Sequence, residues 1–122
     1  LLSREKIQVK DSKVLVMGLA FKENCPDLRN TKVIDVIKGL IDYDIDVDVW
    51  DPWVDFEEAK KEYNISIIKK PSFGKYNGII IAVAHDQFKN IGPEGIRKFG
   101  TQKHVLYDLK YILSENQSDM RL

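Results

Sequence analysis

The sequence has a single cysteine, Cys25, so it cannot form an internal disulfide framework. It also lacks an apolar run close to the roughly 20 residues that span a bilayer. Lysine plus arginine and aspartate plus glutamate number 19 each, so no excess of charge attracts nucleic acid or an anionic membrane. We therefore expect a reduced, cytoplasmic protein whose partners are neither nucleic acids nor membranes.

Two common cofactor motifs and a metal site are also missing. Gly18 is followed by no glycine at the spacing of the dinucleotide fingerprint G-x-G-x-x-G, and Lys22 is not preceded by the glycine of a Walker A loop. His85 and His104 lie far apart, with no cysteine or carboxylate cluster at metal-ligand spacing, so we expect no metal. Any bound anion needs a local site that these motifs do not describe.

The apolar residues form short runs that alternate with amphipathic stretches, a pattern typical of a parallel sheet with helical crossovers. The chain has 122 residues, of which 43% are hydrophobic, enough for one core. We predict an α/β, three-layer Rossmann-like domain whose mainly parallel sheet has about five strands. The expected strands are 13–17, 46–50, 65–68, 78–83 and 104–108, and the expected helices are 31–41, 55–63 and 93–99.

The pattern also predicts three regions along the chain. Because the chain begins with Leu1 instead of methionine, we expect a piece of a longer protein, with residues 1–12 as the remnant of a linker from an upstream domain. Residues 13–113 form the globular domain. Residues 114–122 are polar and are predicted to be a frayed tail.

The loop that joins the first strand to the first helix carries the side chains best suited to a ligand. It contains Phe21, Lys22 and Arg29 and ends at a helix N-terminus that Thr31 can cap. The ring can pack on a base or sugar, and the cations and amides can meet a pyrophosphate. In open α/β sheets ligands bind beyond the carboxyl ends of the strands, where this loop lies.

The motif Gly18-Leu19-Ala20-Phe21-Lys22, followed by Pro26-Asp27-Leu28-Arg29-Asn30, resembles the G-x-x-F-K…D-x-R signature of the UDP-glucose, UDP-N-acetylhexosamine and GDP-mannose dehydrogenase family. The similarity is to the UDP-binding C-terminal domain and continues through Asp51-Pro52, Ala84-His85 and Asp108-Leu109-Lys110. The last two motifs look like the UDP-N-acetylhexosamine branch, which includes enzymes of Vi-antigen and O-antigen polysaccharide biosynthesis.

The resemblance implies a role for each motif residue. Phe21 and Lys22 would contact the UDP part of the substrate, and Arg29 would reach the cofactor NAD, which is bound mainly by the missing N-terminal domain. Lys110 stands where many relatives have a substrate-facing arginine, which could clamp two oxygens where lysine is a point charge. Without the resemblance, Lys22 and Arg29 could be solvated loop cations, and Phe21 could cap the core beneath the loop, a role compatible with packing on a ligand. Asp51 could hold a ribose or, as we favour, cap the turn after its strand.

The family implies that the whole enzyme oxidises the C6 alcohol of a UDP-(N-acetyl)hexosamine to the uronic acid, with two NAD molecules and a covalent intermediate on a cysteine. That cysteine lies upstream in the family, so Cys25 is not it, and we expect no catalytic residue and no activity in this chain alone. The implied partners are the UDP-sugar, the N-terminal and central domains of the same chain and, at full length, a homo-oligomer.

Two other classes compete with this interpretation. In a phospho-acceptor signalling domain Asp51 and Lys110 would be functional, but Gly18-Leu19-Ala20 stands where a magnesium-binding pair of acids is needed. A free-standing NAD-binding Rossmann domain would need the absent glycine fingerprint. Separate titrations with UDP and NAD discriminate the three.

Overall fold

The computed structural model describes residues 12–29, 31–110 and 120–121, the last two by their backbone. Nearly all of the predicted linker, residues 1–12, lies outside this part, as do residues 111–119 and 122 of the C-terminal region.

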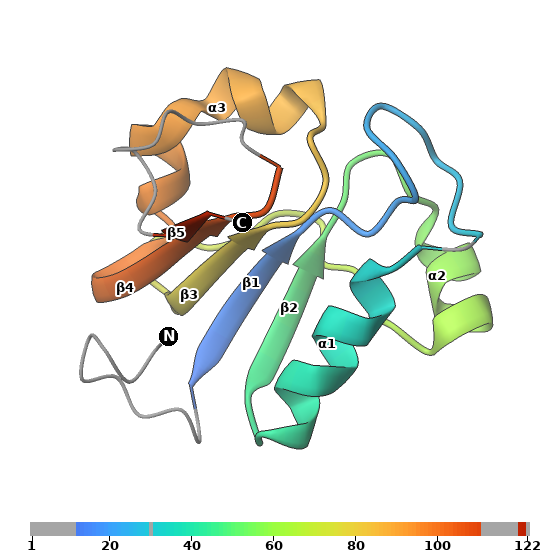
Figure 1. Cartoon of the computed structure of the whole chain (residues 1–122), viewed down its shortest axis with the longest axis horizontal. Coiled ribbons are helices and arrows are strands. Elements are labelled where there is room, and N and C mark those ends of the chain that lie inside the picture. Colours follow the sequence, from blue (N-terminus) through green and yellow to red (C-terminus); the bar gives the residue numbers. More distant parts are fainter. Residues whose placement is uncertain (1–11, 30, 111–119, 122) are drawn as a thin grey trace.

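The described chain alternates strands and helices around one sheet (Figure 1). All strand pairs are parallel, in the order β2-β1-β3-β4-β5. The elements, in chain order, are β1 (Lys13–Met17), α1 (Val33–Asp42), β2 (Asp46–Trp50), α2 (Phe56–Tyr63), β3 (Tyr76–Ile81), α3 (Asp86–Arg97), β4 (Gly100–Asp108) and β5 (Met120–Arg121).

Two apolar clusters, one on each face of the sheet, make the fold three-layered. Val14 and Val16 of β1 pack in one cluster with the buried side of α1 and with Ala59 of α2. Leu15 and Met17 belong to the other cluster, which includes residues of α3. Because β1 is covered on both faces, its sequence is apolar at successive positions and not at alternate ones. The predicted three-layer Rossmann-like fold with a parallel sheet is confirmed.

The helices cover the sheet through one apolar side each. In α1 the buried residues are Val33, Ile34 and Ile37, at helical spacing. Ile41 also has helical spacing to these residues but is 55% exposed, because it falls in the last turn of the helix. Helix α2 is mostly solvated and buries Ala59. Its N-terminus is capped by Asp55, whose side chain accepts a hydrogen bond from the Glu57 amide.

The bounds of α1, β3 and β4 differ from the predicted ones by one to four residues, and three further elements differ more strongly. The expected strand 65–68 is reduced to a single bridge between Val49 and Ile67. Helix α3 begins at Asp86, well before Pro93, and is broken at Gly92, where φ is 76°. The fifth strand is instead β5, which falls within the predicted polar tail. It pairs with Tyr107 and Asp108 of β4. Backbone pairing needs no apolar pattern, so composition does not reveal a strand of this kind.

The order of the strands places a switch point between β1 and β3. The chain crosses from β1 through α1 to β2 on one side, and from β3 through α3 to β4 on the other. Loops leaving β1 and β3 therefore diverge at the carboxyl edge, which in such sheets opens a crevice for ligands. No helix among the described residues is both long and apolar enough to cross a membrane.

Candidate functional site

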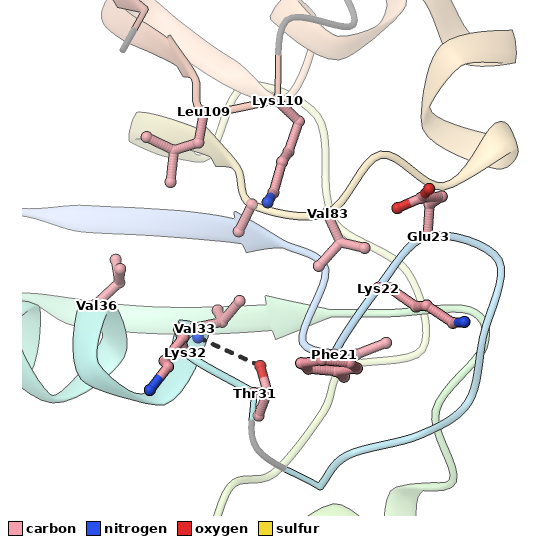
Figure 2. A pocket seen from close by; sticks show the side chains of 12 residues that line it. Phe21, Lys22, Glu23, Thr31, Lys32, Val33, Val36, Val83, Leu109 and Lys110 are labelled. Carbon is pink, nitrogen blue, oxygen red and sulfur yellow. Dashed lines mark hydrogen bonds between the residues drawn. The ribbon is translucent and has the colours of Figure 1, made fainter.

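A pocket of about 400 Å³ lies at the carboxyl edge of the sheet (Figure 2). It is bounded by the loop after β1, the first turn of α1, and the segments that follow β3 and β4. This is the switch point described above, and the volume falls in the range of small-molecule sites. The lining residues are Ala20, Phe21, Lys22, Glu23, Thr31, Lys32, Val33, Val36, Ala82, Val83, Leu109 and Lys110.

The pocket combines an apolar lining with cationic side chains. Small and branched aliphatic residues come from all four segments, and Phe21 adds an aromatic ring that is 52% exposed. Three exposed lysines, Lys22, Lys32 and Lys110, contribute positive charge against one acid, Glu23. The N-terminal turn of α1 adds the positive end of a helix dipole. An anion attached to a flat or apolar group matches this combination.

Figure 2 shows the Lys110 side chain reaching from the end of β4 toward Val83, whereas Lys22 extends outward along its own loop. The two ammonium groups therefore do not point at one spot. Lys22 is exposed, so its side chain can adopt other rotamers.

The loop after β1 leaves the sheet through a tight passage at Gly18. Its φ of 105° lies in a region that suits glycine, and its amide donates to the Trp50 carbonyl at 2.8 Å. A Cβ atom placed there would lie 2.6 Å from the Cβ of Val83. The passage brings the loop beside the β3 end and so forms one wall of the pocket.

A buried aspartate holds the first residues of this loop. Asp51, at the end of β2, is 1% exposed, and its Oδ2 accepts hydrogen bonds from the amides of Leu19 and Ala20 at 2.7 and 2.9 Å. The same oxygen lies 3.0 Å from Nε2 of the fully buried His85. Its Oδ1 accepts from the Trp53 amide at 2.8 Å, which confirms Asp51 as the cap of the following turn.

These contacts change the acidity of Asp51. Burial raises the pKa of the carboxyl, but the hydrogen bonds from His85 and from two loop amides favour the charged form. The net effect places the pKa below its ordinary value of 3.8. Asp51 is therefore a buried carboxylate with both oxygens engaged, which rules out its roles as a ribose ligand and as a phospho-acceptor.

The far part of the loop is fastened at three further points. The Asn24 amide donates to Nδ1 of His85 at 2.9 Å, and the Asn24 side-chain oxygen accepts from the Asp86 amide at 2.9 Å. The Tyr63 hydroxyl donates to the Leu28 carbonyl at 2.6 Å. These bonds tie the loop to α2 and to the start of α3.

The structure gathers three of the predicted site residues at the pocket and separates the fourth. Phe21, Lys22 and Lys110 all line it, and the Phe21 side chain is 52% exposed. Arg29 does not line it. Its side chain, 85% exposed, pairs with the Asp27 carboxylate through two nitrogens at 3.1 and 3.2 Å.

Sequence reasoning missed two features of the site. Lys32 was not singled out, although its place just before the first helical residue could have indicated it. His85 entered only as part of the Ala84-His85 motif and as a histidine without a metal-ligand cluster, and its position after β3 was the signal that it could meet a residue following β2. Within residues 12–29, 31–110 and 120–121 no group of three or more potential ligands could hold a metal.

The sequence matches the family model described as "UDP-glucose/GDP-mannose dehydrogenase family, UDP binding domain" over residues 15–115. A UDP-N-acetyl-D-glucosamine 6-dehydrogenase of Pseudomonas aeruginosa is 59% identical over 119 residues, and one of Salmonella typhi is 54% identical over the same length. Each alignment covers 98% of this chain but only 28% of the relative, so the chain spans little more than a quarter of their length.

Solved structures show the same fold. A UDP-D-ManNAc dehydrogenase from Pyrococcus horikoshii superimposes with a TM-score of 0.77 over 98% of this chain and 27% of its own, at 22% identity. The match over residues 15–115 includes the whole pocket lining. The chain belongs to the UDP-glucose/GDP-mannose dehydrogenase family and corresponds to its UDP-binding domain.

Proposed function

We propose that this chain binds the UDP part of a UDP-N-acetylhexosamine in the pocket at the β1–β3 switch point, as one domain of an NAD-dependent 6-dehydrogenase. The observation that carries the proposal is that Phe21, Lys22 and Lys110 all line one pocket in a domain of this family. The sequence motifs place the three residues on two segments that lie almost 90 positions apart in the chain.

Each side chain has a role that suits its chemistry. The exposed ring of Phe21 packs on the uracil or the ribose, for which an aromatic face and an apolar pocket lining are suited. Lys22 and Lys110 donate to the diphosphate oxygens, and the start of α1 adds its dipole. Lys32 is a third cation within the same lining and adds to the positive potential.

Arg29 takes a different role. Its guanidinium is exposed outside the pocket and pairs with Asp27, so it is accessible to a neighbouring domain. We propose that it contacts NAD bound on the neighbouring domain of the full-length protein. Asp27 would keep the guanidinium extended for that contact.

The sugar is proposed to be N-acetyl-D-glucosamine, because the relatives that are 59% and 54% identical carry that name. Bound NAD would supply the hydride acceptor, and oxidation of the C6 alcohol to the carboxylate would need two NAD and one water for each sugar. This chain contributes binding and orientation. By binding the UDP part of the substrate it positions the distant C6 atom against the reacting groups of the other domains. We also expect the full-length protein to be a homo-oligomer.

The direct test is an assay of the full-length protein with NAD and three sugars: UDP-N-acetylglucosamine, UDP-N-acetylmannosamine and UDP-glucose. The proposal predicts NADH formation with UDP-N-acetylglucosamine, two NADH per sugar, and a much lower kcat/KM with UDP-glucose. Free UDP should inhibit competitively against the UDP-sugar. Absence of NADH formation with all three sugars, or UDP inhibition that the sugar cannot relieve, contradicts it.

A further inference from the structure

The contacts of His85 fix which of its ring nitrogens carries a proton. Nδ1 accepts a hydrogen bond from the Asn24 amide at 2.9 Å, so Nδ1 carries none. Nε2 lies 3.0 Å from the Asp51 carboxylate, an acceptor, and so must donate. His85 is therefore neutral with its proton on Nε2, a state that suits its full burial beside the rings of Phe88 and Trp53.

This imidazole joins two fixed points of the pocket loop. Asp51 holds the loop where it leaves β1, at Leu19 and Ala20, and His85 holds it again at Asn24. Asn24 sits in the left-handed region, with φ of 54°, and that conformation lets its side chain accept from the Asp86 amide while its own amide faces the ring. Phe21 and Lys22 lie between the two points.

Neither buried side chain can touch a ligand in the pocket. Asp51 and His85 are 1% and 0% exposed and do not line it. Their link to the pocket is the backbone of residues 19–24, which carries two of the proposed UDP contacts. Fixing this backbone before the ligand arrives removes an ordering cost from binding.

We propose that Asp51 and His85 are positioning residues that hold the Phe21–Lys22 segment in its binding conformation, and that UDP affinity depends on the bond from Asn24 to Nδ1 of His85. The proposal rests on the function proposed above. It adds that a residue outside the pocket sets the affinity through the loop backbone.

Two substitutions separate this role from a structural one. In His85→Gln the side-chain amide nitrogen can take the place of Nε2 and still donate to Asp51, while the acceptor for the Asn24 amide is lost. His85→Asn places its oxygen near Nδ1 and keeps the acceptor, but loses the donor to Asp51. His104→Gln is the matched control. The His104 imidazole forms hydrogen bonds with Thr101 at the start of β4 and with Arg97 at the end of α3, and neither residue lines the pocket.

The experiment measures amide hydrogen exchange by mass spectrometry and UDP affinity by calorimetry, both on the full-length protein. In His85→Gln we expect faster exchange over residues 19–24, unchanged exchange in β1 and β3, and UDP binding about tenfold weaker. His85→Asn should bind UDP more tightly than His85→Gln even where its melting temperature is lower. If His85 had only a structural role, UDP affinity would follow the melting temperature. The less stable of the two variants would then bind UDP more weakly. The control should match wild type in both loop exchange and UDP affinity.

Failure of this inference is distinguishable from failure of the proposed function. Wild-type protein that does not bind UDP overturns both, and the exchange data then show only whether His85 orders the loop. Wild-type UDP affinity in a folded His85→Gln protein overturns the positioning role and leaves the UDP site standing. Equal loop exchange in wild type and His85→Gln also overturns it.

Discussion

Gly18 and Val83 approach each other so closely that a Cβ atom on Gly18 would lie 2.6 Å from the Val83 Cβ and 2.9 Å from its amide nitrogen. Since the second atom belongs to the backbone, no side-chain rotation relieves the contact, and the φ of 105° adds strain for any other residue. We expect Gly18→Ala to lower the free energy of unfolding by about 2–4 kcal/mol and to weaken UDP binding. Urea unfolding and UDP titration measure the two effects.

Gly39→Ala provides the matched control. Gly39 lies inside α1, where an added Cβ meets nothing within 4 Å, so alanine should leave stability unchanged or raise it by up to about 1 kcal/mol. If both substitutions cost the same, the tight passage at Gly18 does not constrain the loop.

Arg29 and the pocket lysines should separate in their effects on the full-length enzyme. Because Arg29 is 85% exposed and pairs with Asp27 outside the pocket, Arg29→Ala should raise the apparent KM for NAD about tenfold and leave UDP affinity nearly unchanged. Initial rates at varied NAD, together with UDP inhibition constants, provide the readout. Asp27→Ala should give a milder version of the same change. A collapse of UDP affinity with an unaltered NAD response would show that the two roles are exchanged.

The lowered pKa of Asp51 predicts how the free energy of unfolding changes with pH. Its pKa in the folded state lies below the ordinary value of 3.8, so its stabilising effect is present above that value and is lost as the pH falls through the folded-state pKa. The stability difference between wild type and Asp51→Asn should therefore be largest near neutral pH and shrink as the pH falls below about 4. Urea unfolding at pH 7, 5, 4 and 3 measures it. A difference that stays constant across this series would contradict the assigned ionisation.

The parts of the fold that were predictable are those in which the apolar pattern and the burial coincide. β1 is apolar from Val14 to Met17 because both of its faces are covered, and α1 shows its buried residues at helical spacing. Residues 65–68 are similarly apolar, yet only Ile67 makes a bridge, because whether a short apolar run pairs depends on tertiary placement. Strand β5 is held by backbone pairing and leaves no pattern to find.

The residues of the candidate site were predictable only where a motif along the sequence contained them. Phe21 and Lys22 share a loop, and Lys110 could be added through its motif after β4. The contact between Asp51 and His85 joins residues 34 positions apart, one following β2 and the other following β3, and these strands are separated by β1, so spacing along the chain cannot indicate it. The direction of the Lys22 side chain is a matter of rotamer and is also invisible in the sequence.

The chain by itself should be catalytically silent. It has no dinucleotide fingerprint, and its one cysteine, Cys25, lies in the loop after β1, whereas the resemblance implies that the catalytic cysteine lies upstream of this segment. Purified 122-residue chain mixed with UDP-N-acetylglucosamine and NAD should therefore produce no NADH above the blank. Adding the full-length protein to the same cuvette is the positive control. Sustained turnover by the chain alone would contradict the assignment of catalysis to other domains.

The central claim is that the pocket lysines bind the diphosphate of UDP, and calorimetric titration of UDP into the full-length protein and its variants tests it most directly. A charge-assisted contact is worth roughly 1.5–3 kcal/mol, so Lys22→Ala and Lys110→Ala should each weaken binding about ten- to a hundredfold. Both lysines are exposed, so thermal melts should show stability within about 0.5 kcal/mol of wild type. Lys38→Ala, on the exposed side of α1 and outside the pocket lining, should bind UDP as wild type does. Unchanged UDP affinity in both pocket variants, with wild-type protein binding normally, would place the UDP site elsewhere.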